Sequence, residues 1–355
     1  MNGARRFGAG LVVGKFSPLH HGHEHLLATA RAGCERLFCI SYSKPELGGC
    51  TAALRRRWLA ELQPDITHLA LDEAELDRLR RQHPELPELP HNDASELEHR
   101  TFVAEICLRV LGVAVEAVFT SEDYGDGFAA ELSRRFRARV EHVLVDLARR
   151  HVPISATAIR AEPELARRYL SPVVRASFIK RVCLLGGESS GKTTLTRELS
   201  RRFETSRAEE YGRTLWIERD GQLRYDDFLR IGRTQVEHEE AAARAARDVT
   251  FCDTSPLTTL FYCLDQFGRA EPELQVLAER RYDLVLLCSP DVPFVQDGTR
   301  RDPAFRARQH DFYVTELQRR TEPFVLLEGS LETRLEQASG EVLRLAGDVV
   351  ETRPV

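Results

Sequence analysis

The chain has 355 residues, of which 42% are hydrophobic and 30% charged, and its formal net charge is −5. This length favours two domains, each large enough to bury a core of its own. The weak negative charge gives no support for non-specific binding to nucleic acid or to an anionic membrane.

The eight cysteines form no CxxC pair, and several lie in apolar runs, so we expect free thiols in a reducing compartment. The chain has no signal-peptide pattern and no apolar run of about 18 residues that could span a membrane. We therefore predict a cytoplasmic protein. The sequence leaves open whether copies of the chain form a homo-oligomer.

In the first half, short apolar runs alternate with helical patterns. Strands are predicted at residues 11–13, 37–40, 68–71, 117–120 and 142–145. Leu54, Trp58 and Leu62 recur every four residues and predict one buried face of a helix, with Trp58 in the core. Strands separated by helices indicate a parallel, doubly wound α/β sheet.

Residues 72–99 interrupt this alternation. The stretch is rich in charge and contains Pro84, Pro87 and Pro90. It predicts a long loop or a lid over a site, and a solvated connection without a function is the alternative.

The end of the first strand carries a phosphate-binding pattern. A strand that ends at Gly14 and a helix that starts near Gly22 place His20 and His23 at a helix N-terminus. Backbone N–H groups and the helix dipole favour anions there, and Lys15 adds a positive charge. The two imidazoles would face one phosphate. The alternatives for this histidine-rich stretch are a metal site or an exposed polar surface.

A second group of donors follows the fifth strand. Ser155 or Thr157 is suited to cap a helix, and Arg160 lies one turn into that helix. Its guanidinium is suited to bind the β- and γ-phosphates of a nucleotide.

Together these motifs resemble the nucleotidyltransferase superfamily, with its HxGH and ISxTxxR signatures, over residues 7–170. The stretch 121–125 is similar to the SEDYG segment of NadR-type nicotinamide mononucleotide adenylyltransferases, and it weighs against pantetheine-phosphate and glycerol-phosphate relatives. The resemblance implies a tryptophan between residues 72 and 100 that stacks on the nicotinamide ring, and this stretch has none. The nucleotide contacts expected at this site are Gly14, Phe16, Gly22, Ser121, Glu122, Tyr124, Ser155 and Thr157, with Lys15, His20, His23 and Arg160 as catalytic residues.

The second half repeats the alternation of strands and helices with a different motif. Strands are predicted at residues 182–185, 249–252, 284–288 and 324–327. Leu195, Leu199 and Phe203 form the buried stripe of a helix. We expect a boundary within residues 171–177, which separates domains at 1–172 and 177–355.

A Walker A spacing, GxxxxGK[ST], lies between an apolar strand and an amphipathic helix, as a phosphate-binding loop requires. Lys192 is expected to reach the β- and γ-phosphates, and Thr193 to bind Mg²⁺. Asp253 ends a later strand and is predicted to hold Mg²⁺ through water; an acid without a role is the alternative. The nucleotide-binding residues predicted here are Gly186, Glu188, Ser189, Ser190, Gly191, Lys192, Thr193 and Thr194.

Residues 178–335 resemble the ribosylnicotinamide kinase domain of NadR-type proteins. The stretch 209–213 is similar to that family's E-Y-x-R segment, which implies that Glu210 positions or deprotonates the acceptor hydroxyl; a solvated helix end is the alternative. Residues 297–302, with Arg306 and Arg308, resemble its lid, in which Arg300 and Arg301 would contact ATP. Ser255 stands where the resemblance implies an acid.

The two resemblances together imply a bifunctional NAD salvage enzyme. It would phosphorylate nicotinamide riboside and then adenylylate the mononucleotide, with ATP and Mg²⁺. Only six residues precede Phe7, so we expect no helix-turn-helix module and no binding to DNA. The alternatives are the same two reactions on another nucleoside or polyol phosphate, and a P-loop half that acts as a regulatory ATP sensor.

Overall fold

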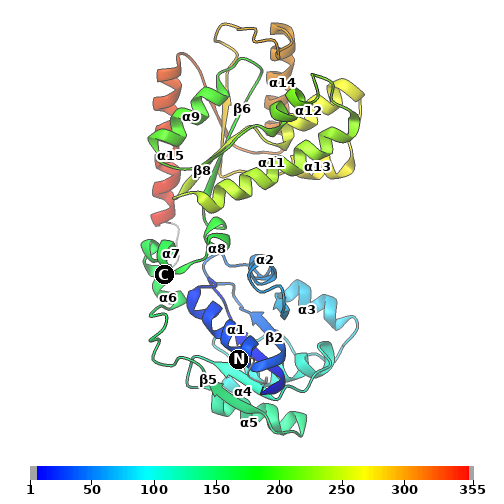
Figure 1. Ribbon diagram of the computed structural model, residues 1–355, viewed down its shortest axis with the longest axis vertical. Helices are drawn as coiled ribbons and strands as arrows, with labels where there is room; N and C mark the ends of the chain where they lie inside the picture. Colours follow the sequence, from blue (N-terminus) through cyan, green and yellow to red (C-terminus); the bar gives the residue numbers. More distant parts are fainter. Residues whose placement is uncertain (1–5, 352–355) are drawn as a thin grey trace. The chain divides into compact units, whose positions relative to one another are not determined.

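The computed structural model describes residues 6–351. The chain divides between Arg175 and Ala176 into two compact units (Figure 1). Among the described residues, no helix has both the length and the apolar character needed to cross a membrane. All eight cysteines are buried thiols, and none takes part in a disulfide.

The first unit is built on a five-stranded parallel sheet with the order β3-β2-β1-β4-β5. Its strands are β1 (Phe7–Gly14), β2 (Cys34–Tyr42), β3 (Thr67–Leu71), β4 (Ala117–Thr120) and β5 (Glu141–Leu144). The central strand β1 pairs with both β2 and β4, so the loop after β1 lies in the middle of the carboxyl edge. In open α/β sheets this edge is where ligands bind.

Helices connect and cover these strands. They are α1 (His21–Gly33), α2 (Ala52–Leu62), α3 (Glu73–Arg80), α4 (Glu96–Glu105) with its π-helical extension η1 (Ile106–Val110), α5 (Gly125–Phe136), α6 (Ala156–Ala161), α7 (Pro163–Tyr169) and α8 (Pro172–Ala176). Leu11, Ile40 and Val118 of the sheet pack against Phe102 of α4 and Phe128 of α5 in one continuous core.

The second unit contains another five-stranded parallel sheet, with the order β10-β9-β6-β8-β7. Its strands are β6 (Lys180–Gly186), β7 (Arg207–Ala208), β8 (Val249–Asp253), β9 (Leu284–Cys288) and β10 (Phe324–Leu327). The helices are α9 (Lys192–Arg202), α10 (Tyr211–Glu218), α11 (Tyr225–Ala245), α12 (Pro256–Phe267), α13 (Pro272–Ala278), α14 (Pro303–Arg319) and α15 (Leu331–Glu351).

Alternate residues of β6 face opposite sides of this sheet, as the period of a strand requires. Val182 and Leu184 pack with α9 and α15, and Cys183 and Leu185 pack with α12 and α14. Figure 1 shows α9 and α15 on one side of β6 and α12 and α14 on the other. Two helical layers therefore bury the sheet, and the carboxyl ends of its strands remain available for polar groups.

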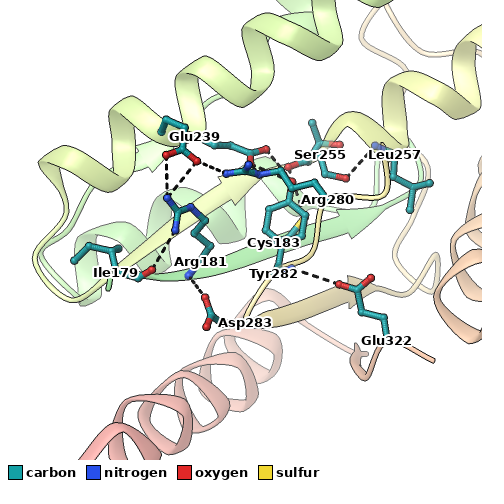
Figure 2. A network of polar contacts seen from close by, with 12 residues as sticks. Ile179, Arg181, Cys183, Glu239, Ser255, Leu257, Arg280, Tyr282, Asp283 and Glu322 are labelled. Carbon is teal, nitrogen blue, oxygen red and sulfur yellow. Dashed lines mark hydrogen bonds and ion pairs between the residues drawn. The ribbon is translucent and has the colours of Figure 1, made fainter. Parts of the chain in front are cut away.

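A buried ion-pair network closes the amino-terminal end of the second sheet (Figure 2). The guanidinium of Arg280 donates to Glu239 at 2.7 Å and to Glu240 at 2.6 Å. Tyr282 donates its hydroxyl to Glu239 at 2.9 Å, and Arg181 of β6 binds Glu240. The side chain of Glu239 is fully buried. The network ties α11 to the segment that leads into β9.

The parallel α/β fold predicted for both halves is confirmed, and every predicted strand is present. The prediction that residues 72–99 form a loop is wrong at both ends, where α3 and the start of α4 are found. Asp72 caps α3 by accepting a hydrogen bond from the Glu75 amide at 2.8 Å, and Leu76 and Leu79 bury its apolar side. The short two-residue strand β7 was not predicted, because its pattern is too short to detect.

Candidate active sites

The first site forms where β1 passes into α1. His20 is the N-cap of α1, and its Nδ1 accepts a hydrogen bond from the Gly22 amide at 3.1 Å. The rings of His20 and His23 stack with centroids 3.7 Å apart, and Phe16 meets His23 edge-on at 4.9 Å. Gly14 is needed here because a Cβ would lie 2.8 Å from the Phe16 ring.

Both stacked histidines are neutral at pH 7. Burial lowers the pKa of His20 to about 4, with a contribution from the positive charge of Arg149. Burial also lowers the pKa of His23 well below its usual value, helped by His20 and Arg149. Neutral rings act here as hydrogen-bonding groups, so the positive charge at the site comes from lysine and arginine.

A cavity of about 500 Å³ opens beside these rings at the carboxyl edge of the sheet. All the residues that the sequence predicted for this site line it: Gly14, Lys15, Phe16, His20, Gly22, His23, Ser121, Glu122, Tyr124, Ser155, Thr157 and Arg160. Ser155 rather than Thr157 caps α6, by accepting from the Ala158 amide at 3.1 Å. Arg160 binds the Thr157 hydroxyl at 3.1 Å and the carbonyl of Ser17.

Sequence reasoning missed several side chains of this cavity, among them Arg149, Tyr42 and His99. Arg149 lies in the loop after β5 with a left-handed φ of 48°, and it faces Glu122 at 3.9 Å. Tyr42 and His99 lie close together, with the tyrosine hydroxyl 3.0 Å from the His99 Nδ1. None of these three residues is part of a recognisable sequence motif. Trp58 is fully buried in the core, as predicted, and is not a lining residue.

The second site is the loop between β6 and α9. Gly186, Ser189 and Gly191 have φ values of 151°, 58° and 84°. A Cβ on Gly186 would lie 2.6 Å from the Ser190 hydroxyl and 3.0 Å from the Cys288 carbonyl. The glycines thus allow a tight loop whose end opens directly into a helix N-terminus, which is the arrangement that binds phosphate.

An acidic pair lies next to this loop. Asp253 is 3% exposed, and its Oδ1 has no hydrogen-bond partner among the described residues. Burial and, to a lesser extent, the Glu210 carboxylate raise the pKa of Asp253 to about 6, against the opposing effects of Lys192 and the Thr193 hydroxyl. A buried, unsatisfied carboxylate oxygen beside a threonine hydroxyl fits a hard divalent cation.

The described residues contain no group of three or more His, Cys, Asp and Glu side chains that could hold a metal ion by itself. A cation at the second site would therefore share its ligands between protein, water and a phosphate chain. Lys192 currently donates to the Gly187 carbonyl at 3.4 Å, and Thr193 and Thr194 follow it in the first turn of α9.

Residues 290–302 contain no helix or strand and lie between β9 and α14. They include the stretch 297–302 that is expected to act as a lid, and we call them the lid segment. Arg300 donates to the Ser189 hydroxyl of the P-loop at 3.2 Å. Arg301 instead directs its guanidinium toward Asp265 and over the Phe305 ring at 4.2 Å. Of the two arginines expected to contact a nucleotide, Arg300 is the one whose side chain lies at the phosphate loop.

Ser255, which stands where an acid was expected, is the N-cap of α12. Its hydroxyl accepts from the Leu257 amide at 3.3 Å, and the residue is 2% exposed. Its role at this position is structural, and it supplies no carboxylate to the site.

Comparison with known proteins gives relatives over most of the chain. The trifunctional NAD biosynthesis/regulator protein NadR of Salmonella typhimurium is 32% identical over 316 residues, which are 83% of this chain and 72% of the relative. NadR of Escherichia coli is 31% identical over 311 residues, 82% of this chain and 71% of the relative. Crystal structures of NadR protein in complex with NR, and with NAD and AMP-PNP, match 96% of this chain at 22% identity with TM-scores of 0.65 and 0.64. An AAA domain family model matches residues 181–334.

Two parallel α/β sheets, each with a phosphate-binding loop after its central strand, define a two-domain protein of the nucleotide-binding class. Within this class, the sequence identity to the two NadR relatives extends over most of this chain and of each relative, and it identifies the family. The chain belongs to the NadR family.

Proposed function

We propose that the chain is a bifunctional NAD salvage enzyme. The second domain, residues 177–355, phosphorylates nicotinamide riboside with ATP, and the first domain, residues 1–172, joins the mononucleotide to the adenylyl group of ATP. The observation that carries the proposal is that a NadR-family chain has two different phosphate-binding sequence motifs, each at a strand-to-helix junction of one unit.

In the second domain, the riboside hydroxyl attacks the γ-phosphorus of ATP, the bond from the γ-phosphorus to the β–γ bridging oxygen breaks, and ADP leaves. Glu210 accepts the hydroxyl proton or orients the hydroxyl, since its charge acts on the buried Asp253 beside the loop. Lys192 and Arg300 stabilise negative charge on the phosphates. Thr193 and Asp253 would hold Mg²⁺, which neutralises charge on the β- and γ-phosphates when it is bound.

In the first domain, the phosphate of the mononucleotide attacks the α-phosphorus of ATP. A new P–O–P bond forms, the α–β bridging bond breaks, and pyrophosphate leaves without a covalent enzyme intermediate. The neutral rings of His20 and His23 donate hydrogen bonds, and Lys15 and Arg160 supply the positive charge. Catalysis therefore rests on positioning and charge stabilisation.

The nicotinamide ring needs a flat surface in the first cavity. We propose that Tyr42 and His99, which both line this cavity, supply it; their ring centroids are 5.7 Å apart, with an angle of 27° between the ring planes. This pair supports an aromatic acceptor in a chain that lacks the expected tryptophan.

The test is incubation of the whole chain with ATP, Mg²⁺ and nicotinamide riboside, followed by chromatography. We expect the mononucleotide to appear first and NAD second, with ADP equal to the sum of mononucleotide and NAD, and pyrophosphate equal to NAD. Other nucleosides in place of the riboside measure the acceptor preference. Binding of ATP without ADP formation for any acceptor would instead favour a regulatory ATP sensor in the second half.

A further inference from the structure

Glu188 lies inside the P-loop, where the sequence predicts a nucleotide contact, but protein groups occupy its hydrogen-bonding atoms. Its amide donates to the Gln309 side-chain oxygen at 2.9 Å. Its carboxylate accepts from the Tyr262 hydroxyl at 2.9 Å and from the Arg301 amide at 2.6 Å. One residue therefore contacts α12, α14 and the lid segment at the same time.

The contact with Gln309 continues into a buried chain of hydrogen bonds. Gln309 donates to the Tyr313 hydroxyl at 3.1 Å, and that hydroxyl lies 2.7 Å from the Thr258 hydroxyl. Thr258 in turn binds Thr254, the residue after Asp253. Gln309 and Tyr313 are fully buried. Because buried polar groups are costly to leave unpaired, this chain fixes the backbone of Glu188 relative to the end of β8.

The two carboxylate contacts face different parts of the site. Tyr262 belongs to α12, which begins three residues after Asp253 at the end of β8 and so starts at the predicted acceptor side. Burial and the carboxylates of Glu188 and Glu210 raise the pKa of its hydroxyl. The lid segment is held by neighbouring P-loop atoms, because the Ser189 hydroxyl accepts from the Val295 amide at 2.8 Å and from Arg300. Glu188 and Ser189 thus both accept hydrogen bonds from the lid segment and hold it in place.

We infer that Glu188 is a positioning residue that couples closure of the lid segment to the alignment of the acceptor side of the phosphoryl-transfer site. The inference rests on the kinase activity proposed above. When the lid is closed, the Arg301 amide and the Tyr262 hydroxyl bind the two oxygens of one carboxylate. Because each contact restricts the rotation of that carboxylate, forming one contact makes the other more favourable. The loop amides, Lys192 and Arg300 are left to bind the nucleotide phosphates.

The test uses Glu188→Gln, which keeps the side-chain shape and removes the charge, and Tyr262→Phe, which removes one donor. Both reduce kcat for riboside phosphorylation, Glu188→Gln by about tenfold or more, while the Kd for ATP changes less than about twofold. The double variant is no slower than Glu188→Gln, because both changes break one coupled unit. Glu336→Gln, an exposed acid bonded to Arg202, is the control with unchanged kinetics.

A second measurement needs no acceptor. Limited trypsin cleavage after Arg300 and Arg301 is followed with a non-hydrolysable ATP analogue bound. We expect the wild-type lid to be protected and the Glu188→Gln lid to be cleaved several-fold faster. Wild-type kcat and protection in Glu188→Gln, or a loss that appears only in the Kd for ATP, would overturn the inference. A wild-type chain that phosphorylates no riboside refutes the proposed function, and the cleavage comparison still decides the role of Glu188.

Discussion

His20 both caps α1 and lines the first cavity, and the two roles depend on the same neutral ring. Its Nδ1 accepts the Gly22 amide, so protonation of that nitrogen would break the cap. Burial keeps the proton off. The protonation of His20 therefore affects both the stability of the α1 N-terminus and the hydrogen bonds that this ring can offer in the first cavity.

This linkage predicts a stability change with pH. The pKa of His20 is about 4 in the folded chain and 6.5 in the unfolded chain, so the unfolded chain binds the proton more tightly between these values. The stabilisation is complete above pH 6.5 and is lost as the pH falls toward 4, by up to about 3 kcal/mol. Urea unfolding of the Trp216→Phe variant, in which Trp58 reports on the first unit, measures the loss.

The matched comparison is His20→Asn in the same background, because asparagine retains a capping oxygen and does not titrate. Its unfolding free energy should fall less steeply between the same pH values. Identical slopes in both proteins would show that His20 does not carry the effect.

Two substitutions should separate the proposed reactions. His23→Ala removes a group that acts on the phosphates of the first site, and we expect adenylylation to fall by about 10²-fold or more while riboside phosphorylation continues. Lys192→Ala should have the opposite pattern. The measurement is the rate of each half-reaction with its own substrate supplied. A folded variant that loses both activities contradicts the two-site proposal.

The acidic pair of the second site can be assigned by kinetics. Glu210→Gln removes the proposed base and keeps the shape, so kcat should fall by about 10²-fold with little change in ATP affinity. Asp253→Asn should instead increase the Mg²⁺ concentration needed for half-maximal rate. If Glu210→Gln leaves kcat unchanged and the kcat of Asp253→Asn stays low at saturating Mg²⁺, the base is Asp253.

At the scale of elements, capping and ion pairs decide where segments begin and how they are fixed. Asp72 starts α3 in a stretch whose prolines suggest a loop, because one side-chain oxygen satisfies an amide at the helix end. The network of Glu239 and Arg280 connects α11 to the entry of β9 in the same local manner (Figure 2).

Loss of one partner in this network should be costly. Glu239→Ala leaves Arg280 and Tyr282 without their shared carboxylate in a buried place, and we expect the second unit to lose about 3 kcal/mol or more. Urea unfolding of the Trp58→Phe background, in which Trp216 reports on the second unit, measures the change. Glu336→Ala, which removes an exposed acid paired with the exposed Arg202, should cost less than about 1 kcal/mol. Equal costs would mean that the network adds nothing.

At the scale of the whole molecule, each unit has its own sheet and its own buried clusters. We therefore expect a cut within residues 171–177 to give two fragments, each with a cooperative unfolding transition and its own half-reaction. Separate expression followed by calorimetry and activity assays checks this. Two insoluble fragments would indicate that the units depend on each other for folding.

The sequence by itself determined nine of the ten described strands, the two phosphate motifs and the expected α/β class, because each depends on local spacing. The apolar runs at 284–288 and 324–327 coincide with β9 and β10, and the histidine motif does form a helix N-terminus. The family resemblance rested on the same short motifs.

Only the tertiary structure decided which distant side chains meet at a site. Arg149, Tyr42 and His99 reach the first cavity from three separate segments, and no spacing along the chain connects them. Glu188 has the sequence position of a nucleotide ligand, but its partners come from α12, α14 and the lid segment. Local patterns report backbone geometry within a few residues, whereas side-chain partners depend on packing between elements that the chain separates by many residues.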